Sequence, residues 1–328
     1  MHQNLKKISL TEHETALLML GRELKKLNYH FITVTPLTHQ RVLDRQATRT
    51  PDLFLSESLR DVFGWNRPFK KTLLPPQMFD LMERSSALEA LDGDLFRSQI
   101  RFSSLNNSLF LHSGYPTTTN ISVFFGPDTY RYTRFVQEQL LHITAKGMTE
   151  PLRVVDLGCG SGAGGLIVRD HCREIVLSDI NSLALSYSRV NAALNSSLPL
   201  DVSIVESDLF SNLDGKFDLV MANPPFLMDK GERSYRHGGD QLGSELSSRI
   251  VKESLTHLKP GGWLFLYTAS AIVAGKDLFR ESLQALLEQF EYNYSEIDPD
   301  IFGEELATPA YASVERIAAV CLAARRKQ

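Results

Sequence analysis

This 328-residue sequence lacks long apolar stretches. No apolar run approaches the roughly 18 residues that a membrane-spanning helix needs. The opening residues, Met1 to Lys7, are not followed by the apolar region of a signal peptide. We therefore expect a cytoplasmic protein with no part in the membrane.

Cysteine is also scarce. The three cysteines, Cys159, Cys172 and Cys321, lie far apart, and no two of them have the spacing of metal ligands. This pattern argues against a disulfide framework and against a zinc site. We predict a chain that binds no metal, and we expect a monomer.

Compositional bias is absent as well. The sequence is 43% hydrophobic and 23% charged, as in ordinary globular proteins. Its length exceeds the roughly 100–200 residues of a typical domain. Two domains are therefore expected, and one large core is the alternative.

Charge is unevenly distributed along the chain. The formal net charge is −4, yet residues 1–75 carry twelve Lys and Arg against seven Asp and Glu, which gives this segment +5 and the remainder −9. A basic segment of this kind suits the backbone of a nucleic acid. The alternative is a solvated helical surface, because no basic run is dense or interleaved with aromatic residues.

The N-terminal part is predicted to be mainly helical, with helices over residues 12–27, 51–63 and 76–91. Thr11 and Glu14 have the spacing of a capping box. Thr50 and Pro51 supply an N-cap and a first-turn proline, and Gly64 suits the end of that helix. Extended segments on either side of Asn106-Asn107 predict a small β-hairpin.

From Arg153 onward, short apolar strands alternate with helices, a rhythm typical of a parallel sheet covered on both faces. Seven strands are predicted, over residues 153–157, 174–178, 201–206, 217–222, 263–268, 292–297 and 316–323. The predicted fold is therefore α/β. We expect a helical and hairpin domain over 1–118 that selects the substrate. We expect a doubly wound seven-stranded domain over 119–328.

A glycine-rich loop follows the first of these strands, in Asp156-Leu157-Gly158-Cys159-Gly160-Ser161-Gly162. Glycine permits positive φ and a close approach of ligand to backbone at the carboxyl end of a strand. We expect a nucleotide-like cofactor here. The loop alone is ambiguous, because residues 160–165 also satisfy the G-x-G-x-x-G dinucleotide pattern.

Two acidic residues follow the next strands. Asp179 ends the second strand, where a carboxylate accepts hydrogen bonds from ribose hydroxyls. Asp208 follows the third strand, where it is placed to accept from an adenine amino group. A helix N-cap is the structural alternative for Asp208.

The tetrapeptide Asn223-Pro224-Pro225-Phe226 directly follows the fourth strand. Two prolines fix φ and remove two amide donors, so the Asn223 amide oxygen and the Pro224 carbonyl form a nearly rigid pair of acceptors. A planar amine bound to both acceptors has its lone pair toward an electrophile, and Phe226 is placed to stack on the attached π-system. The alternative is a turn that only ends the strand.

These motifs, in this order, resemble those of class I S-adenosylmethionine-dependent methyltransferases of the HemK-like and nucleobase-amine (NPPF/NPPY) group. The resemblance covers about residues 120–328 and includes Gly126–Thr129, Tyr235–Asp240 and Lys259–Leu264. It implies a Rossmann-like sheet and S-adenosyl-L-methionine as the cofactor. It also implies that Asp156 organises the loop, Gly158 and Gly160 contact the amino-acid part of the cofactor, Asp179 the ribose and Asp208 the adenine.

The predicted site follows from this resemblance. The catalytic set is Asn223, Pro224, Pro225 and Phe226. The cofactor-binding set is Asp156, Gly158, Cys159, Gly160, Gly162, Asp179, Ile180, Asp208, Leu209 and Asn223. The glutamine enzymes of this group usually carry tyrosine at the position of Phe226 and have a shorter N-terminal domain, so the identity of the substrate does not transfer.

We predict an N-methyltransferase that acts on a planar amide or exocyclic amine, in RNA or in a protein glutamine. A small-molecule metabolite is the alternative substrate. An NAD-linked oxidoreductase explains the glycine loop and Asp179 but gives no role to residues 223–226. Trp65, Arg67, Tyr235 and His237 are candidates for substrate contacts, with packing or solvent exposure as the structural alternatives.

Overall fold

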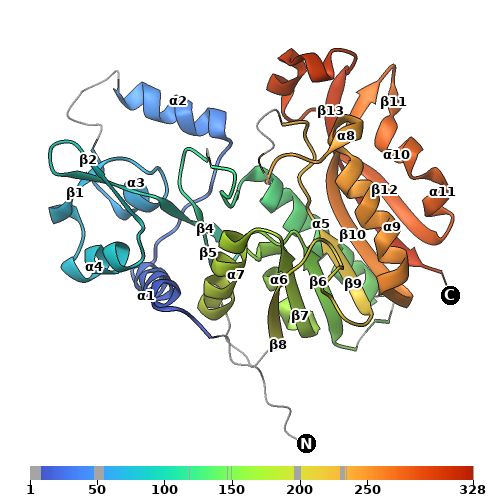
Figure 1. Ribbon diagram of the computed structural model, residues 1–328, viewed down its shortest axis with the longest axis horizontal. Coiled ribbons are helices and arrows are strands. Elements are labelled where there is room, and N and C mark those ends of the chain that lie inside the picture. The colour runs from blue at the N-terminus through green and yellow to red at the C-terminus, as the bar shows by residue number, and fades with distance from the viewer. Residues whose placement is uncertain are drawn as a thin grey trace, which may run out of the picture. The chain divides into compact units, whose positions relative to one another are not determined.

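The computed structural model describes residues 9–47, 55–117, 119–145, 147–148, 150–195, 201–229, 233 and 235–327 (Figure 1). The chain forms two compact units. Unit 1 comprises Met1–Tyr130, Gly160–Ala163 and Leu183–Pro199, and unit 2 comprises Arg131–Cys159, Gly164–Ser182 and Leu200–Gln328. The units are thus interleaved along the sequence, and the predicted domain boundary after residue 118 stays a prediction.

Unit 1 begins with the predicted helix α1, Glu12–Lys26. Its capping box is confirmed: the Thr11 hydroxyl accepts from the Glu14 amide at 3.2 Å, and the Glu14 carboxylate accepts from the Thr11 amide at 3.0 Å. These two bonds satisfy amides that a helix start otherwise leaves without partners. Sequence pattern and structure therefore agree at this end of the chain.

Two helix predictions in unit 1 need correction. Helix α3 is Leu59–Phe63 and not 51–63, because the Ser58 hydroxyl caps it by accepting from the amide of Asp61; Gly64 ends it as predicted, and Thr50-Pro51 lies outside the described residues. Helix α4 is Pro76–Arg84 and not 76–91, because Ser86 adopts the left-handed conformation with φ +46°. A further helix, α2 (Pro36–Ala47), was not predicted.

The strands of unit 1 form two small sheets. β1 (Phe69–Lys70), β2 (Leu88–Leu91) and β3 (Leu95–Ser98) are ordered β1-β3-β2, with the 3-10 helix η2 (Lys71–Leu73) after β1. The turn between β2 and β3 holds Gly93 at φ +72° and Asp94 at φ +57°, so Asp92-Gly93 is a hairpin signal that the prediction missed. The predicted hairpin over 106–107 is confirmed as β4 (Ile100–Leu105) and β5 (Ser108–Ser113).

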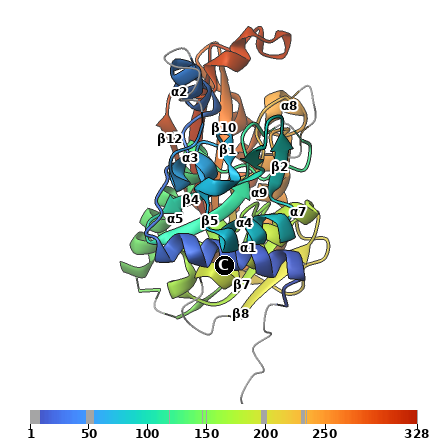
Figure 2. The same cartoon turned by 90° about the vertical axis from the view of Figure 1, so that its left-hand side faces the viewer.

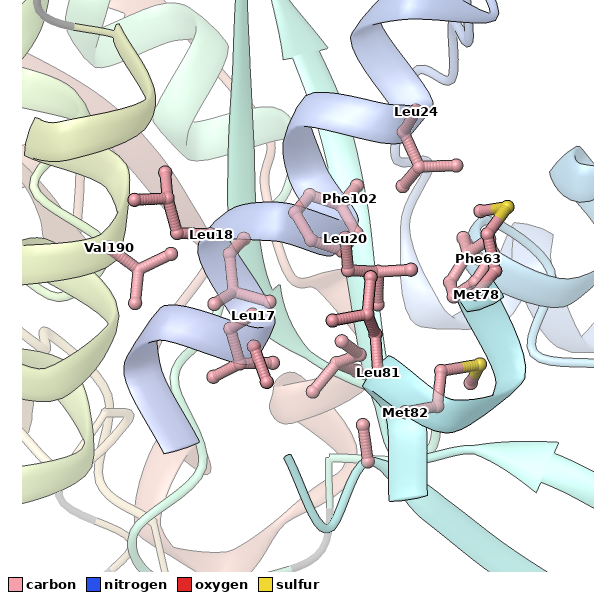
Figure 3. Close-up of a cluster of buried hydrophobic side chains, with 14 of the residues drawn as sticks. Leu17, Leu18, Leu20, Leu24, Phe63, Met78, Leu81, Met82, Phe102 and Val190 are labelled. Atoms are coloured by element: carbon pink, nitrogen blue, oxygen red, sulfur yellow. The ribbon is translucent and has the colours of Figure 1, made fainter. Parts of the chain in front are cut away.

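The core of unit 1 lies between α1, α4 and one face of the β4–β5 hairpin. Figure 2 shows α1 beside α4, and the close-up in Figure 3 shows their apolar side chains facing one another. Helix α7 (Ser182–Asn195) adds Val190 to the same cluster. Leu20 and Phe102 are completely buried here. The cluster therefore joins residues of the N-terminal part to a helix from the second half of the sequence.

Unit 2 is built on the predicted sheet, whose seven strands are confirmed; two of them have the predicted bounds, and the other five are longer. They are β6 (Leu152–Leu157), β7 (Cys172–Asp179), β8 (Asp201–Glu206), β9 (Phe217–Ala222), β10 (Leu258–Val273), β12 (Phe290–Asp298) and β13 (Arg316–Arg326). Their order is β12-β13-β10-β9-β6-β7-β8, and the short β11 (Lys276–Asp277) also pairs with β10. Only β13 runs antiparallel to both of its neighbours, so the predicted α/β class is confirmed.

Helices cover both faces of this sheet. Val155 and Leu157 pack with α9 (Glu245–His257), α10 (Leu278–Ser282) and α11 (Gln284–Leu287), which lie together along one side in Figure 1. Val154 points to the other face and packs with α5 (Pro127–Ala145). This alternation is that of a doubly wound sheet.

Shorter helices complete the chain. They are α6 (Ala163–Ile167), η3 (Arg169–His171), α8 (Asp240–Gly243), η4 (Gly303–Ala307) and η5 (Pro309–Tyr311). Within the described ranges, no helix has both the length and the apolar character needed to cross a bilayer.

Replacing Leu20 by Ala should lower the free energy of unfolding by about 2–5 kcal/mol, because the lost methyl groups leave a cavity in a packed core. Urea unfolding monitored by circular dichroism measures this change. Leu37→Ala is the matched control, since Leu37 is 52% exposed, and a change below about 0.5 kcal/mol is expected there. Equal effects of the two substitutions would contradict the core assignment.

Candidate functional site

The strand register of unit 2 brings the predicted site residues to one edge of the sheet. Leu157 at the end of β6 pairs with Ala222 at the end of β9 and with Ser178 in β7. Asp179 in turn pairs with Glu206 at the end of β8. Because these four strands are parallel and about 4.8 Å apart, the residues that follow them lie side by side. Their order along the edge is Asn223, Gly158, Asp179 and Asp208.

Asp156 is buried beneath this edge, with 2% of its surface exposed. One carboxylate oxygen accepts from the Tyr132 hydroxyl at 3.0 Å, and the other accepts from the Gly165 amide at 2.7 Å. Burial raises the pKa of Asp156 to about 7, against the lowering effect of these two hydrogen bonds. The carboxyl group therefore connects β6 to the chain after the glycine loop, and its role in organising the loop around a cofactor stays a prediction.

Tyr132 is a site residue that the sequence did not reveal. It lies on α5, and burial, together with the nearby Asp156 carboxylate, raises the pKa of its hydroxyl well above 10. A Cβ atom on Gly164 would lie 2.6 Å from the Tyr132 ring and 2.8 Å from Asp156. The adjacent glycines Gly164 and Gly165 were the sequence signal for this contact, because packing this close leaves no room for a side chain.

The glycine loop has the backbone conformation that its sequence predicts. Gly158, Gly160 and Gly162 have φ of +62°, +54° and +75°, a region that side chains disfavour. Apart from the adjacent residues, no atom of the described chain lies within 4 Å of a Cβ built on Gly158, so open space adjoins this residue. Gly160 and Gly162 group with unit 1. The Cys159 side chain is buried, and its amide donates to the Ser178 carbonyl at 2.9 Å.

The two predicted carboxylates differ in exposure. Asp179 is half-buried, and one of its oxygens accepts from the Asn181 amide at 2.9 Å, while the next residue, Ile180, is 60% exposed. Asp208 is exposed and lies 3.4 Å from the Arg249 guanidinium. Leu209 is buried and has φ +48°, which turns the chain sharply after Asp208. Both carboxylates therefore remain accessible to solvent.

The tetrapeptide leaves β9 as predicted, with Asn223 half-buried. In the described part of the chain, the side-chain amide of Asn223 makes no hydrogen bond, so its oxygen and its NH₂ group are both free to bond a ligand. Phe226 is only 8% exposed and packs between Tyr267 at 6.2 Å and Phe302 at 5.8 Å, measured between ring centroids. Much of the Phe226 ring is thus used in the core, and its stacking on a substrate stays a prediction.

The segment after the tetrapeptide is held by the predicted glycine-containing stretch over 235–240. The Leu227 amide donates to the Arg236 carbonyl at 3.1 Å, and the Gly238 amide donates to the Leu227 carbonyl at 2.8 Å. A Cβ atom on Gly238 would lie 2.7 Å from the Pro225 carbonyl oxygen. Gly238 therefore fixes the backbone of the tetrapeptide by close approach.

An ion network adjoins this segment. Asp229 binds the guanidinium of Arg233, and this bond lowers the pKa of the carboxyl to about 2. Arg236 lies 3.4 Å from Asp229, pairs with Glu305, and places its guanidinium 5.8 Å from the Phe302 ring centroid. The sequence did not predict this network, because Phe302 and Glu305 lie far along the chain in η4 and its N-cap.

The other candidates for substrate contacts fall in different places. Tyr235 and His237 are half-buried beside the tetrapeptide segment in unit 2, and the Nδ1 atom of His237 is buried with no partner in the described chain. Trp65 and Arg67 belong to unit 1, where Arg67 pairs with Asp61 at 3.1 Å. Among the described residues, no group of three or more His, Cys, Asp or Glu side chains is arranged to hold a metal ion.

Comparison with known proteins agrees with this geometry. Residues 138–293 match the family model described as the Methyltransferase small domain. The Ribosomal RNA small subunit methyltransferase C of Pasteurella multocida is 35% identical over 135 residues, which are 40% of this chain and 37% of that protein. The Release factor glutamine methyltransferase of Deinococcus radiodurans is 35% identical over 143 residues, which are 39% of this chain and 50% of that protein.

A solved structure, the ribosomal protein L11 methylase of Lactobacillus delbrueckii subsp. bulgaricus, matches with a TM-score of 0.40 and 19% identity, covering 61% of this chain and 80% of that one. The chain spans about a third to a half of the length of the curated relatives it matches. The resemblance to class I methyltransferases inferred from the motifs is confirmed by the family match and by these relatives.

Replacing Asp156 by Asn should remove a pH dependence of stability. A folded pKa of about 7, above the ordinary value of 3.8, means that folding favours the protonated acid. Its stabilising effect is complete below about pH 4 and is lost as the pH rises through 7. The amide of the variant stays neutral, so the stability of the wild type should fall relative to Asp156→Asn between pH 5 and 8, by about 3 kcal/mol.

Urea unfolding at the two pH values measures this difference. Asp208→Asn is the control, since the Asp208 side chain is 63% exposed and its variant should follow the wild type at both pH values. A constant gap between wild type and Asp156→Asn would show that the buried acid does not titrate in this range.

Proposed function

We propose that this chain is an S-adenosylmethionine-dependent N-methyltransferase that acts on a planar amide or exocyclic amine, in RNA or in a protein glutamine. The observation that carries the proposal is the pairing of Leu157 with Ala222, which sets Asn223 beside Gly158 at the carboxyl edge of the sheet. A cofactor loop and a pair of oxygen acceptors thereby adjoin the same strand ends.

The residues of this edge fit the cofactor. Gly158 has positive φ and open space where a side chain would stand, which suits the amino-acid part of the cofactor against the backbone. Asp179 is half-buried, so its carboxylate can accept from two ribose hydroxyls. Asp208 is exposed one strand further along, which suits contact with the adenine. When bound, S-adenosylmethionine supplies an electrophilic methyl group.

The tetrapeptide orients the acceptor nitrogen. The Asn223 amide oxygen and the Pro224 carbonyl accept the two hydrogens of a planar NH₂ group, and the lone pair of that nitrogen then faces the cofactor side of the edge. Fixed φ at both prolines keeps the acceptors in place. Such positioning supplies several kcal/mol of the barrier reduction without any covalent intermediate.

The ion network around Arg236 and the packing of Gly238 stabilise the tetrapeptide. Gly238 contacts Pro225 closely, and Phe302 packs on Phe226 beneath the Arg236 guanidinium. The tetrapeptide therefore rests on buried packing rather than on a loose loop, which is what a positioning mechanism requires.

The relatives support the two substrate classes. One is named for ribosomal RNA and the other for release factor glutamine. The region over 1–118 is proposed to select between such partners. A metabolite is the alternative substrate, and a monomer in the cytoplasm stays the expectation from the sequence.

Calorimetry should show that the full chain binds S-adenosylmethionine and does not bind NAD. The glycine loop and Asp179 suit both cofactors, but only the first explains Asn223 and Pro224. Binding of NAD alone would end the proposal and would favour an oxidoreductase.

Replacing Asn223 by Ala should leave the affinity for S-adenosylmethionine within a few-fold and reduce methyl transfer by about a hundredfold or more, because an acceptor of the amine is lost. Transfer is measured with tritiated cofactor on RNA and on protein isolated from cells that lack the gene. Asn293→Ala, on an exposed position of β12, should behave as wild type. Unchanged turnover in Asn223→Ala would refute the role of this residue.

A further inference from the structure

Unit 1 holds a buried cation that has no counter-ion among the described residues. Arg101, on β4, is 5% exposed, and it forms no ion pair with any acidic side chain that the structure describes. Its Nε atom is buried and has no hydrogen-bond partner among the described residues. A buried guanidinium in this condition is costly, because neither its charge nor all of its donors are satisfied.

The neighbours of Arg101 are hydroxyl groups and two histidines, and burial together with the charge of Arg101 lowers the pKa of His112 well below its ordinary value, so that ring is neutral. The Arg101 Nη2 donates to the Thr33 hydroxyl at 3.0 Å, and Thr33 in turn is bonded to the Ser103 hydroxyl. Ser103 lies 2.7 Å from His112 Nε2, while His112 Nδ1 lies 3.0 Å from the Ser113 carbonyl. Since a carbonyl only accepts, Nδ1 of His112 carries the proton, and every hydroxyl donates toward His112.

The other side of the guanidinium is also neutral. His39 Nε2 lies 3.0 Å from the Trp65 carbonyl, so this nitrogen carries the proton, and Nδ1 is left as an acceptor 3.5 Å from Arg101 Nη1. Burial and the charge of Arg101 lower the pKa of His39 to about 4. Neither histidine nor any hydroxyl of the group therefore supplies a negative charge.

Two aromatic rings contact His39, whose Nδ1 atom lies 3.5 Å from the Arg101 guanidinium. The His39 ring stacks on Tyr115 with centroids 4.0 Å apart and lies 5.0 Å from Trp65. Tyr115 and Trp65 are both half-buried, and their rings keep part of their surface open to solvent. Within residues 36–45 of α2, His39 is the one buried residue.

We propose that Arg101 binds a phosphate group of an RNA strand, with the attached nucleotide base stacked on Tyr115 or Trp65. A phosphate supplies the missing charge and accepts from the guanidinium in bidentate fashion, replacing the neutral imidazole of His39. Partly exposed aromatic rings in the neighbourhood of a cation are typical of surfaces that bind single-stranded nucleic acid. This inference rests on the proposed function in one respect, since it makes RNA the substrate class.

Trp65 provides the measurement. The chain has two tryptophans, so Trp263→Phe leaves Trp65 as the sole fluorescent reporter. The probes are adenosine 5′-monophosphate, adenosine, inorganic phosphate and a short single-stranded RNA oligonucleotide. We expect fluorescence changes with the monophosphate and with the oligonucleotide, tighter binding of the oligonucleotide, and little response to adenosine.

Arg101→Met in this background should weaken binding of both phosphate-bearing probes by about thirtyfold or more, as for loss of one partner of a buried charge pair. Its thermal midpoint should not fall, because an uncompensated buried charge is removed. Arg101→Lys retains the charge but not the planar fork, and an intermediate affinity is expected. Arg97→Met is the control, since Arg97 on β3 pairs with Glu89 and should leave binding unchanged.

The outcomes separate the sources of the phosphate. Equal binding by wild type and Arg101→Met would overturn the proposal, and so would the absence of a response to every probe. A large loss of stability in Arg101→Met would also overturn it, because the cation would then have a structural role. Binding of the monophosphate or of inorganic phosphate without the oligonucleotide would overturn RNA as the source. Calorimetry with S-adenosylmethionine on the same proteins tests the proposed function separately, because Arg101 lies outside the cofactor edge.

Discussion

The parallel pairing between β6 and β9 is the constraint on which the candidate site depends. Its ladder ends with Leu157 opposite Ala222, so two segments that lie far apart in the sequence leave the sheet as neighbours. A shift of this register by one residue would turn the apolar side chains of β9 to the wrong faces, because strand side chains alternate. The packing of both helix layers fixes the register of β9 and so the position of Asn223. The geometry of the site is therefore as well defined as that of the core.

Satisfaction of buried polar groups is the second theme of the structure. Asp156 lies under the glycine loop, and its two oxygens receive the Tyr132 hydroxyl and the Gly165 amide, which offset part of the cost of burial. Arg101 lies in a comparable environment but, among the residues that the structure describes, has one unmet donor and no opposing charge. Asp156 is thus a buried polar group whose partners lie within the fold, whereas Arg101 is one that can still bond a ligand.

Much of unit 2 could be predicted from the sequence, because its strands are continuous apolar segments that end in polar motifs. The ends of β6 and β9 also gave the positions of Gly158 and Asn223. Local pattern failed where tertiary contacts decide: α2 presents few apolar residues, and residues 88–91 became β2 only through pairing with β3. Tyr132 and the Arg236–Glu305 pair were missed because their partners come from distant segments. The roles of the individual site residues toward cofactor and substrate stay predictions.

The hydrogen bonds that lead from Arg101 through Thr33 and Ser103 to His112 all donate in the same direction, and this affects how unit 1 responds to a change of pH. His112 donates to the Ser113 carbonyl at the end of this series of bonds, and His39, on the other side of Arg101, donates to the Trp65 carbonyl, so each imidazole has a single tautomer. Burial lowers the pKa of both His39 and His112, so neither ring gains a proton under neutral or mildly acidic conditions. The interior thus keeps one pattern of hydrogens, and acidification within that range leaves its electrostatic character unaltered.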